Sequence, residues 1–160
     1  MRFCLVDRII EIEAGVQITA VKNLTSAEEY LADHFPGFPI MPGVLMVESL
    51  VQTGAWLMRH TENFAYSTIL LKEARAVKFS SFVKPGQTLQ TQCNVHKRDE
   101  NEYVLKATGT VDGKPAATAR LTLKQFNLSD HSPELACGDR KNIEYLRELF
   151  DQIWSTTSLT

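Results

Sequence analysis

Cysteine is scarce in this sequence, and its spacing is irregular. The 160 residues contain three cysteines, Cys4, Cys93 and Cys137, and no CxxC pair. An odd, widely spaced set fits neither a disulfide framework nor a zinc site, so it indicates a reducing compartment. The scattered histidines show no metal-ligand spacing either. We therefore expect a cytoplasmic protein without a metal ion.

Long apolar runs and a strong net charge are also missing. No apolar run approaches the ~18 residues that a membrane helix needs, so we expect no membrane span. The first residues, MRFCLVDR, lack the uninterrupted apolar core of a signal peptide. A net charge of −2 argues against nucleic-acid binding through phosphate attraction. With 44 % apolar and 22 % charged residues, the composition is typical of a globular protein.

Proline and glycine are few, and they gather in one place. Three of the six prolines and two of the eight glycines lie within residues 36–43. Residues 44–59 follow without proline and are apolar on nearly every face, with one polar line through Glu48, Gln52 and Arg59. A helix that is apolar almost all round is buried. We therefore expect a helix wrapped by the rest of the domain.

Most of the remaining chain alternates with the period of a strand. This alternation predicts strands at 17–22, 76–83, 88–95, 103–111 and 115–124, with a hairpin at Asp112-Gly113. A polar connector is expected at 126–138 and an amphipathic helix at 142–154. One buried helix and successive antiparallel strands favour an α+β fold with a curved sheet around the helix. We expect one domain at 1–125, and a connector with a C-terminal helix at 126–160.

Three features that can carry chemistry coincide near the start of the buried helix. His34 supplies an imidazole, which titrates near neutral pH and suits proton transfer. The helix is expected to begin near Gly43, where the first backbone N–H groups are unpaired and carry partial positive charge. Burial favours the protonated form of a carboxyl group, which suits Glu48 to donate a proton. A base, an oxyanion donor and an acid together predict elimination of water from a 3-hydroxyacyl compound.

The segment HFPGFPIMPGVLMVESLVQ, residues 34–52, resembles the active-site segment of a known enzyme family. This family is the FabZ type of 3-hydroxyacyl-[acyl-carrier-protein] dehydratases of fatty-acid synthesis. The similarity extends over about residues 2–124 and includes VKFSSFVKPGQTL and ATGTVDGKPAATARLTL. The resemblance implies a hotdog fold, in which an antiparallel sheet curves around a long central helix. The helix expected at 142–154 lies beyond the usual end of this fold.

The resemblance also implies roles for three residues and an assembly. His34 would take the C2 proton of the acyl thioester, and Glu48 would protonate the departing 3-hydroxyl group. The Gly43 N–H would hold the thioester carbonyl. No metal or redox cofactor is implied. Family members work as a dimer or a trimer of dimers, and each site takes the histidine from one chain and the acid from the other.

The implied partner is an acidic acyl carrier protein bearing a 3-hydroxyacyl thioester. The chain departs from the family at Ser80 and Ser81, where arginines are often found. Residues 72–84 nevertheless have a net charge of +3. This charge favours attraction of an acidic partner, and the candidate docking residues are Lys72, Arg75, Lys78 and Lys84.

Two other functions stay open at this point. A lone carboxylate that activates a water molecule could hydrolyse the thioester, which would make the protein a hotdog thioesterase. The chain could also be a non-catalytic acyl-binding subunit that pairs with an active paralogue.

Overall fold

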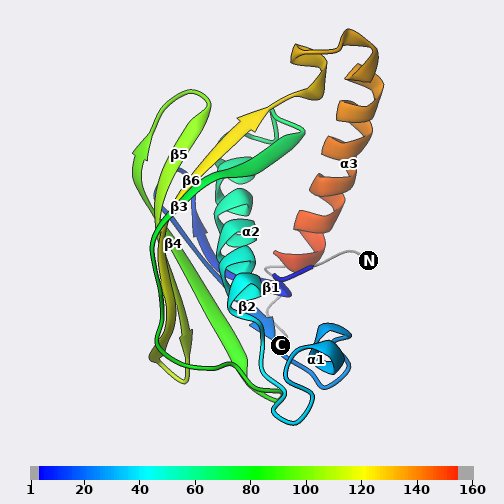
Figure 1. Ribbon diagram of the computed structural model, residues 1–160. Helices are drawn as coiled ribbons and strands as arrows, with labels where there is room; N and C mark the ends of the chain where they lie inside the picture. Colours follow the sequence, from blue (N-terminus) through cyan, green and yellow to red (C-terminus); the bar gives the residue numbers. More distant parts are fainter. Residues whose placement is uncertain (1–3, 155–160) are drawn as a thin grey trace, which may run out of the picture.

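One curved sheet wraps around one long helix in this protein (Figure 1). The computed structural model describes residues 4–154. The strands are β1 (Arg8–Glu13), β2 (Gln17–Asn23), β3 (Thr68–Phe79), β4 (Thr88–Arg98), β5 (Glu102–Val111) and β6 (Lys114–Phe126). The helices are α1 (Tyr30–Asp33), α2 (Gly43–Thr61) and α3 (Ala136–Ile153), with 3-10 turns η1 (Leu128–Asp130) and η2 (Pro133–Leu135). All strand pairs are antiparallel, in the order β1-β2-β4-β5-β6-β3.

Helix α2 lies in the hollow of the sheet, and its apolar residues form the centre of the core. Alternate residues of β4 and β5 are buried beneath it, as the period-two pattern requires. The closest approach is at Gly54, where an added methyl group would lie 2.4 Å from Leu105 Cδ1. Glycine at this position lets the helix contact Leu105 and Leu123 directly. Each buried leucine of this core contributes about 1.5–3 kcal/mol.

The expected buried helix and most expected strands are confirmed. The helix expected at 44–59 extends over residues 43–61. The strands expected at 17–22, 88–95, 103–111 and 115–124 correspond to β2, β4, β5 and β6. The hairpin is also confirmed, because Asp112 (φ +50°) and Gly113 (φ +74°) both adopt the left-handed backbone of a tight two-residue turn.

The strand expected at 76–83 is wrong at both ends. Strand β3 already starts at Thr68 and stops at Phe79. The Ser80 N–H still bonds to β6, at the Ala116 carbonyl (2.8 Å), and the Ser81 N–H shares that carbonyl at 3.4 Å, so the regular pairing ends here. The Val83 carbonyl then accepts the Met41 N–H at 2.9 Å. Residues 80–83 therefore connect the sheet to the proline-rich loop.

Helix α3 covers the side of α2 that faces away from the sheet (Figure 1). Its Phe150 ring contacts Trp56, His60 and Phe64, with ring centroids 5.3–5.9 Å apart. The helix begins at Ala136 and not at Asn142, and the connector expected at 126–138 contains η1, η2 and the first three residues of α3. The apolar stripe starts only at Ile143, so periodicity did not reveal these turns.

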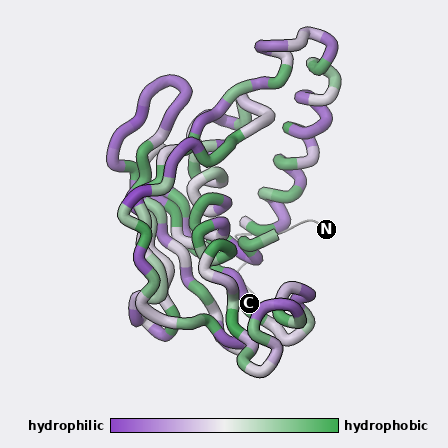
Figure 2. The backbone as a smooth tube through the Cα atoms, viewed as in Figure 1, coloured by the Kyte–Doolittle hydropathy of each residue, from purple (hydrophilic) through white to green (hydrophobic). Residues whose placement is uncertain are grey.

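Strand β3 forms one edge of the sheet, and its side chains are largely exposed. Figure 2 shows hydrophilic residues concentrated at the turn between β4 and β5. The β3 edge is different, because Leu70, Leu71 and Val77 are apolar and exposed. Within residues 4–154, no helix is both long enough and apolar enough to span a membrane.

Candidate active site

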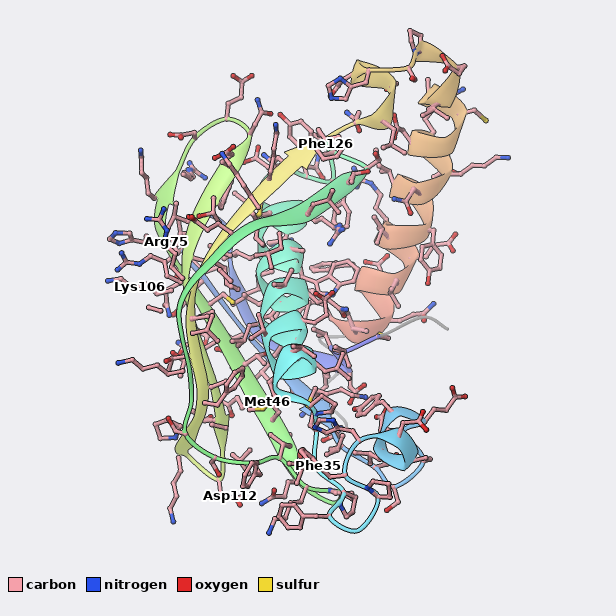
Figure 3. The ribbon with its side chains drawn as sticks, viewed as in Figure 1. Phe35, Met46, Arg75, Lys106, Asp112 and Phe126 are labelled. Atoms are coloured by element: carbon pink, nitrogen blue, oxygen red, sulfur yellow. The ribbon has the colours of Figure 1, made fainter. Side chains whose placement is uncertain are left out.

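A pocket of about 480 Å³ lies between the proline-rich loop, the start of α2 and the end of β3. Figure 3 labels Phe35 and Met46, which lie at this end of α2. The pocket contains one imidazole among mostly apolar side chains. Its lining residues are His34, Phe35, Ile40, Met41, Gly43, Met46, Phe79, Ser80, Ser81 and Phe82.

His34 is held at the end of the short helix α1 by local backbone structure. Its N–H bonds to the Tyr30 carbonyl at 3.2 Å, and its ring lies 4.5 Å from that of Phe35 between centroids. Phe35 adopts φ +50°, which is unfavourable for a residue with a side chain. The Phe38 N–H stabilises this turn by bonding to the Phe35 carbonyl at 2.7 Å. Strain of this kind, of about 1–3 kcal/mol, concentrates at functional sites.

Gly43 is the first residue of α2, as expected. The first bonds of the helix run from the N–H groups of Leu45 and Met46 to the Pro42 carbonyl, at 3.0 and 3.1 Å. The Gly43 N–H precedes these bonds and lies at the positive end of the helix dipole. An added Cβ at Gly43 would lie 3.0 Å from the Phe79 ring. Glycine therefore keeps this wall of the pocket open to a carbonyl oxygen.

Glu48 is half-buried on α2 and has a defined partner. Its Oε1 accepts a hydrogen bond from Gln52 Nε2 at 3.0 Å. Gln52 Oε1 in turn accepts the Leu5 N–H at 2.9 Å. Glu48 is not among the residues that line the His34 pocket of the same chain. The structure therefore brings His34 and Gly43 together in one pocket, with Glu48 outside it.

The four candidate docking residues lie in different surroundings. Lys72 bonds to Glu102 at 2.6 Å, and Arg75 bonds to Glu73 at 2.8 Å. Lys84 lies 5.3 Å from the centroid of the Phe38 ring, close to the pocket wall formed by Phe82. Lys78 lies on β3 beside Arg75, next to the pocket residue Phe79.

Two further cations join Arg75 and Lys78 on the outer face of the sheet. The strand register places Lys106 opposite Arg120, and Arg120 opposite Arg75. Arg75 and Lys106 lie on the face turned away from α2 (Figure 3). Sequence reasoning missed Lys106 and Arg120, because alternation can place a residue on a face but cannot give its cross-strand partner.

Metal-ligating side chains do not gather anywhere in the described structure. No group of three or more His, Cys, Asp or Glu residues within positions 4–154 could hold a metal ion.

The curved antiparallel sheet around α2 defines a hotdog-fold protein. Solved structures with the same fold include the dehydratase heterocomplex ApeI:P from Xenorhabdus doucetiae, with a TM-score of 0.68 and 19 % identity, covering 83 % of this chain and 90 % of that one. A second is a mutant thioesterase, PA1618, from Pseudomonas aeruginosa, with a TM-score of 0.59 and 17 % identity, covering 74 % and 80 %. At these identities the likeness concerns the fold alone.

Sequence comparison narrows this class to one family. The FabA-like domain family matches residues 1–120. The 3-hydroxyacyl-[acyl-carrier-protein] dehydratase FabZ of Oenococcus oeni is 42 % identical over 117 residues, which is 73 % of this chain and 84 % of the relative. The FabZ of Janthinobacterium sp. (strain Marseille) is 38 % identical over 135 residues, or 81 % and 85 %. The chain belongs to the FabA-like domain family, among the dehydratases named FabZ.

Proposed function

We propose that this protein is a hydro-lyase that converts (3R)-3-hydroxyacyl-[acyl-carrier-protein] thioesters to trans-2-enoyl thioesters. The reaction serves fatty-acid or related lipid biosynthesis in the cytoplasm. One observation carries the proposal: His34 and Gly43 line a single pocket whose other walls are mostly apolar. The relatives named above as dehydratases support the same reaction.

The proposed mechanism divides the elimination between three groups. The thioester carbonyl accepts a hydrogen bond from the Gly43 N–H, which stabilises the enolate charge that develops on its oxygen. His34 takes the C2 proton as general base. The C3–O bond breaks as the C2=C3 double bond forms, and Glu48 gives its proton to the departing hydroxyl group. One water molecule leaves, and the proton on His34 then restores Glu48 through solvent.

The proposed site needs a second copy of the chain. Glu48 is not among the residues that line the His34 pocket of its own chain, which supports a site in which the histidine comes from another chain. Strand β3 offers twelve residues of unpaired edge with exposed apolar side chains, and such an edge pairs readily with another strand. We propose a homodimer joined at this edge, in which each pocket combines His34 and Gly43 with the partner's Glu48.

The carrier protein is proposed to dock on the positively charged side of β3. Ser80 and Ser81 line the pocket and carry no charge, so attraction has to come from neighbouring residues. Lys78 directly precedes the pocket residue Phe79, and Lys84 lies beside the Phe38 ring. Arg75 and Lys72 extend the surface along β3, and Lys106 and Arg120 widen it on the outer face. Such a surface accelerates encounter with an acidic partner.

The decisive experiment measures hydration of a crotonyl thioester by the loss of enoyl absorbance. We expect His34→Ala and Glu48→Gln each to lose about 10²–10⁴-fold in kcat, since each removes a general acid or base. His96→Ala and Glu144→Gln are matched controls, because both residues are exposed and line no part of the pocket. A thiol reagent in the same assay would detect hydrolysis. Near-native rates in the first two variants, or thiol release without dehydration, would refute the proposal.

A further inference from the structure

A second cavity lies between α2 and α3, away from the His34 pocket. Its volume is about 520 Å³, within the range of about 300–1,000 Å³ that small-molecule sites occupy. None of its lining residues lines the His34 pocket. The lining residues are Cys4, Gln52, Trp56, Arg59, Tyr145, Leu146 and Leu149. We call this cavity the α2–α3 groove.

Among the lining residues of the groove, Arg59 is the one whose side chain carries a charge at neutral pH. Its guanidinium carbon lies 5.2 Å from the centroid of the Trp56 ring, and its Nε is buried without a hydrogen-bond partner. No ion pair joins Arg59 to a carboxylate within residues 4–154. Burial lowers the pKa of Arg59 to about 10, so the group remains charged at neutral pH. Arg59 as a whole is half-buried, and a partly buried cation without a counter-charge is stabilised by an anion that pairs with it.

Arg147 shows that an arginine of α3 can combine an aromatic contact with an oxygen partner in the turn after α2. It lies on α3, and its Nη2 donates to the Asn63 carbonyl at 2.6 Å while its guanidinium covers the Phe64 ring at 4.9 Å. Arg59 has the aromatic contact but lacks the oxygen partner at Nε. The difference leaves in the lining of the groove a guanidinium that no carboxylate within residues 4–154 neutralises.

We propose that the α2–α3 groove binds a free long-chain carboxylate, with Arg59 pairing with the head group. A guanidinium matches a carboxylate by two parallel hydrogen bonds, and the desolvated setting strengthens them. Trp56, Leu146 and Leu149 offer apolar walls for the hydrocarbon tail. A single cation suits a monoanion, whereas a doubly charged phosphate would remain half-neutralised. The carboxylate would bind outside the His34 pocket, although Gln52 of the groove wall also bonds to Glu48.

The test compares two probes of equal length on the full chain by equilibrium dialysis. Dodecanoate carries the charge, and dodecanol carries only the tail. We expect the native protein to bind dodecanoate at least ten-fold more tightly than dodecanol. Arg59→Met should abolish this preference for dodecanoate. Arg59→Lys should keep part of it, because lysine retains the positive charge but cannot form the two parallel hydrogen bonds of a guanidinium. Arg147→Met is the matched control and should keep the full preference.

Three outcomes would overturn the proposal. They are the absence of dodecanoate binding to the native protein, equal affinity for the two probes, and an unchanged preference in Arg59→Met. The last would place the carboxylate elsewhere, including the His34 pocket, which Arg59 does not line. Circular dichroism would show whether Arg59→Met folds. If it does not fold, the affinities of the native protein and of Arg59→Lys for dodecanoate and dodecanol test the proposal. Loss of dehydratase activity in His34→Ala leaves this measurement unaffected, so the two proposals fail separately.

Discussion

Gln52 connects Glu48 to the first described residues of the chain. Its Oε1 accepts the Leu5 N–H, so its amide nitrogen must face Glu48, where it donates to Oε1. This pair of hydrogen bonds fixes the direction of the carboxylate on the surface of α2. Under the proposed mechanism, Gln52 is a positioning residue for the proton donor.

Replacement of Gln52 by leucine tests this role at nearly constant volume. We expect Gln52→Leu to lower kcat about ten-fold with KM changed less than two-fold, because misplacing an acid affects the chemical step. Steady-state hydration of a crotonyl thioester gives both constants.

Ser49→Ala is the matched control for this variant. Ser49 Oγ donates to the Leu5 carbonyl at 2.8 Å but does not touch Glu48. Each variant removes one hydrogen bond to Leu5, at a cost of about 0.5–1.5 kcal/mol in the free energy of unfolding. Equal losses of kcat in Gln52→Leu and Ser49→Ala would show that Gln52 acts only through stability.

At the level of the elements, the buried carboxylate of Asp139 holds the first turn of α3 in place by hydrogen bonds. Asp139 is 4 % exposed and accepts hydrogen bonds from the Ser67 hydroxyl and from the backbone N–H groups of Leu128 (3.1 Å) and Ser129 (2.9 Å). The Ser67 hydroxyl, helped by Ser129 and Leu128, lowers the pKa of Asp139 to about 2, although burial opposes this shift. The ionised carboxylate therefore joins α3 to the start of β3.

This fastening predicts a specific sensitivity to acid. A lowered pKa means that the ionised form stabilises the folded protein above the ordinary pKa of about 3.9, and that this contribution is lost as the pH falls toward 2. We expect Asp139→Asn to unfold at lower denaturant concentration than the native protein at pH 7, and the two to converge between about pH 4 and pH 2. Urea denaturation followed by tryptophan fluorescence measures both. Asp151→Asn, at an exposed carboxylate of α3, should match the native protein throughout.

The sequence predicts those elements whose signal is local. Alternation located β2, β4, β5 and β6, and Asp112-Gly113 located a turn that requires two left-handed residues. The proline-rich loop and Gly43 likewise mark the start of α2. Element ends set by distant partners were not predictable. Strand β3 ends where Ser80 and Ser81 share the Ala116 carbonyl, and the first turn of α3 is held by the bond between Asp139 and Ser67.

The residues of the candidate site also fall into a group that the sequence predicts and a group that it does not. His34, Gly43 and Glu48 lie within one continuous segment, and their residue types suggest their chemistry. Lys106 and Arg120 belong to strands far along the chain from Arg75, and only the register brings the three together. The α2–α3 groove was not predictable either, because α3 contacts α2 across about ninety residues of chain, a separation that helical periodicity does not address.

For the whole molecule, the question is whether His34 and Glu48 of one site belong to one chain or to two. In one chain, the pocket that contains His34 is closed on one side by Phe79 at the end of β3 and does not include Glu48. The exposed edge of β3 pairs with no other strand among residues 4–154. A site shared between two chains reconciles both observations, and it makes a prediction that a site within one chain does not make.

Mixing two inactive variants should restore activity if each site combines His34 of one chain with Glu48 of its partner. A dimer of one His34→Ala chain and one Glu48→Gln chain contains one intact site and one doubly damaged site. Co-refolding equal amounts should therefore recover about a quarter of the native activity, since half of the dimers are mixed and each has one of two sites. Hydration of a crotonyl thioester by the refolded mixture measures this recovery. Two further variants, each introduced into both chains, test where the chains meet. Val77→Glu on the β3 edge should abolish the recovered activity, whereas Ile10→Glu on the opposite edge strand β1 should leave it unchanged.

A mixture as inactive as its components, with mixed dimers verified by native mass spectrometry, would refute the shared site.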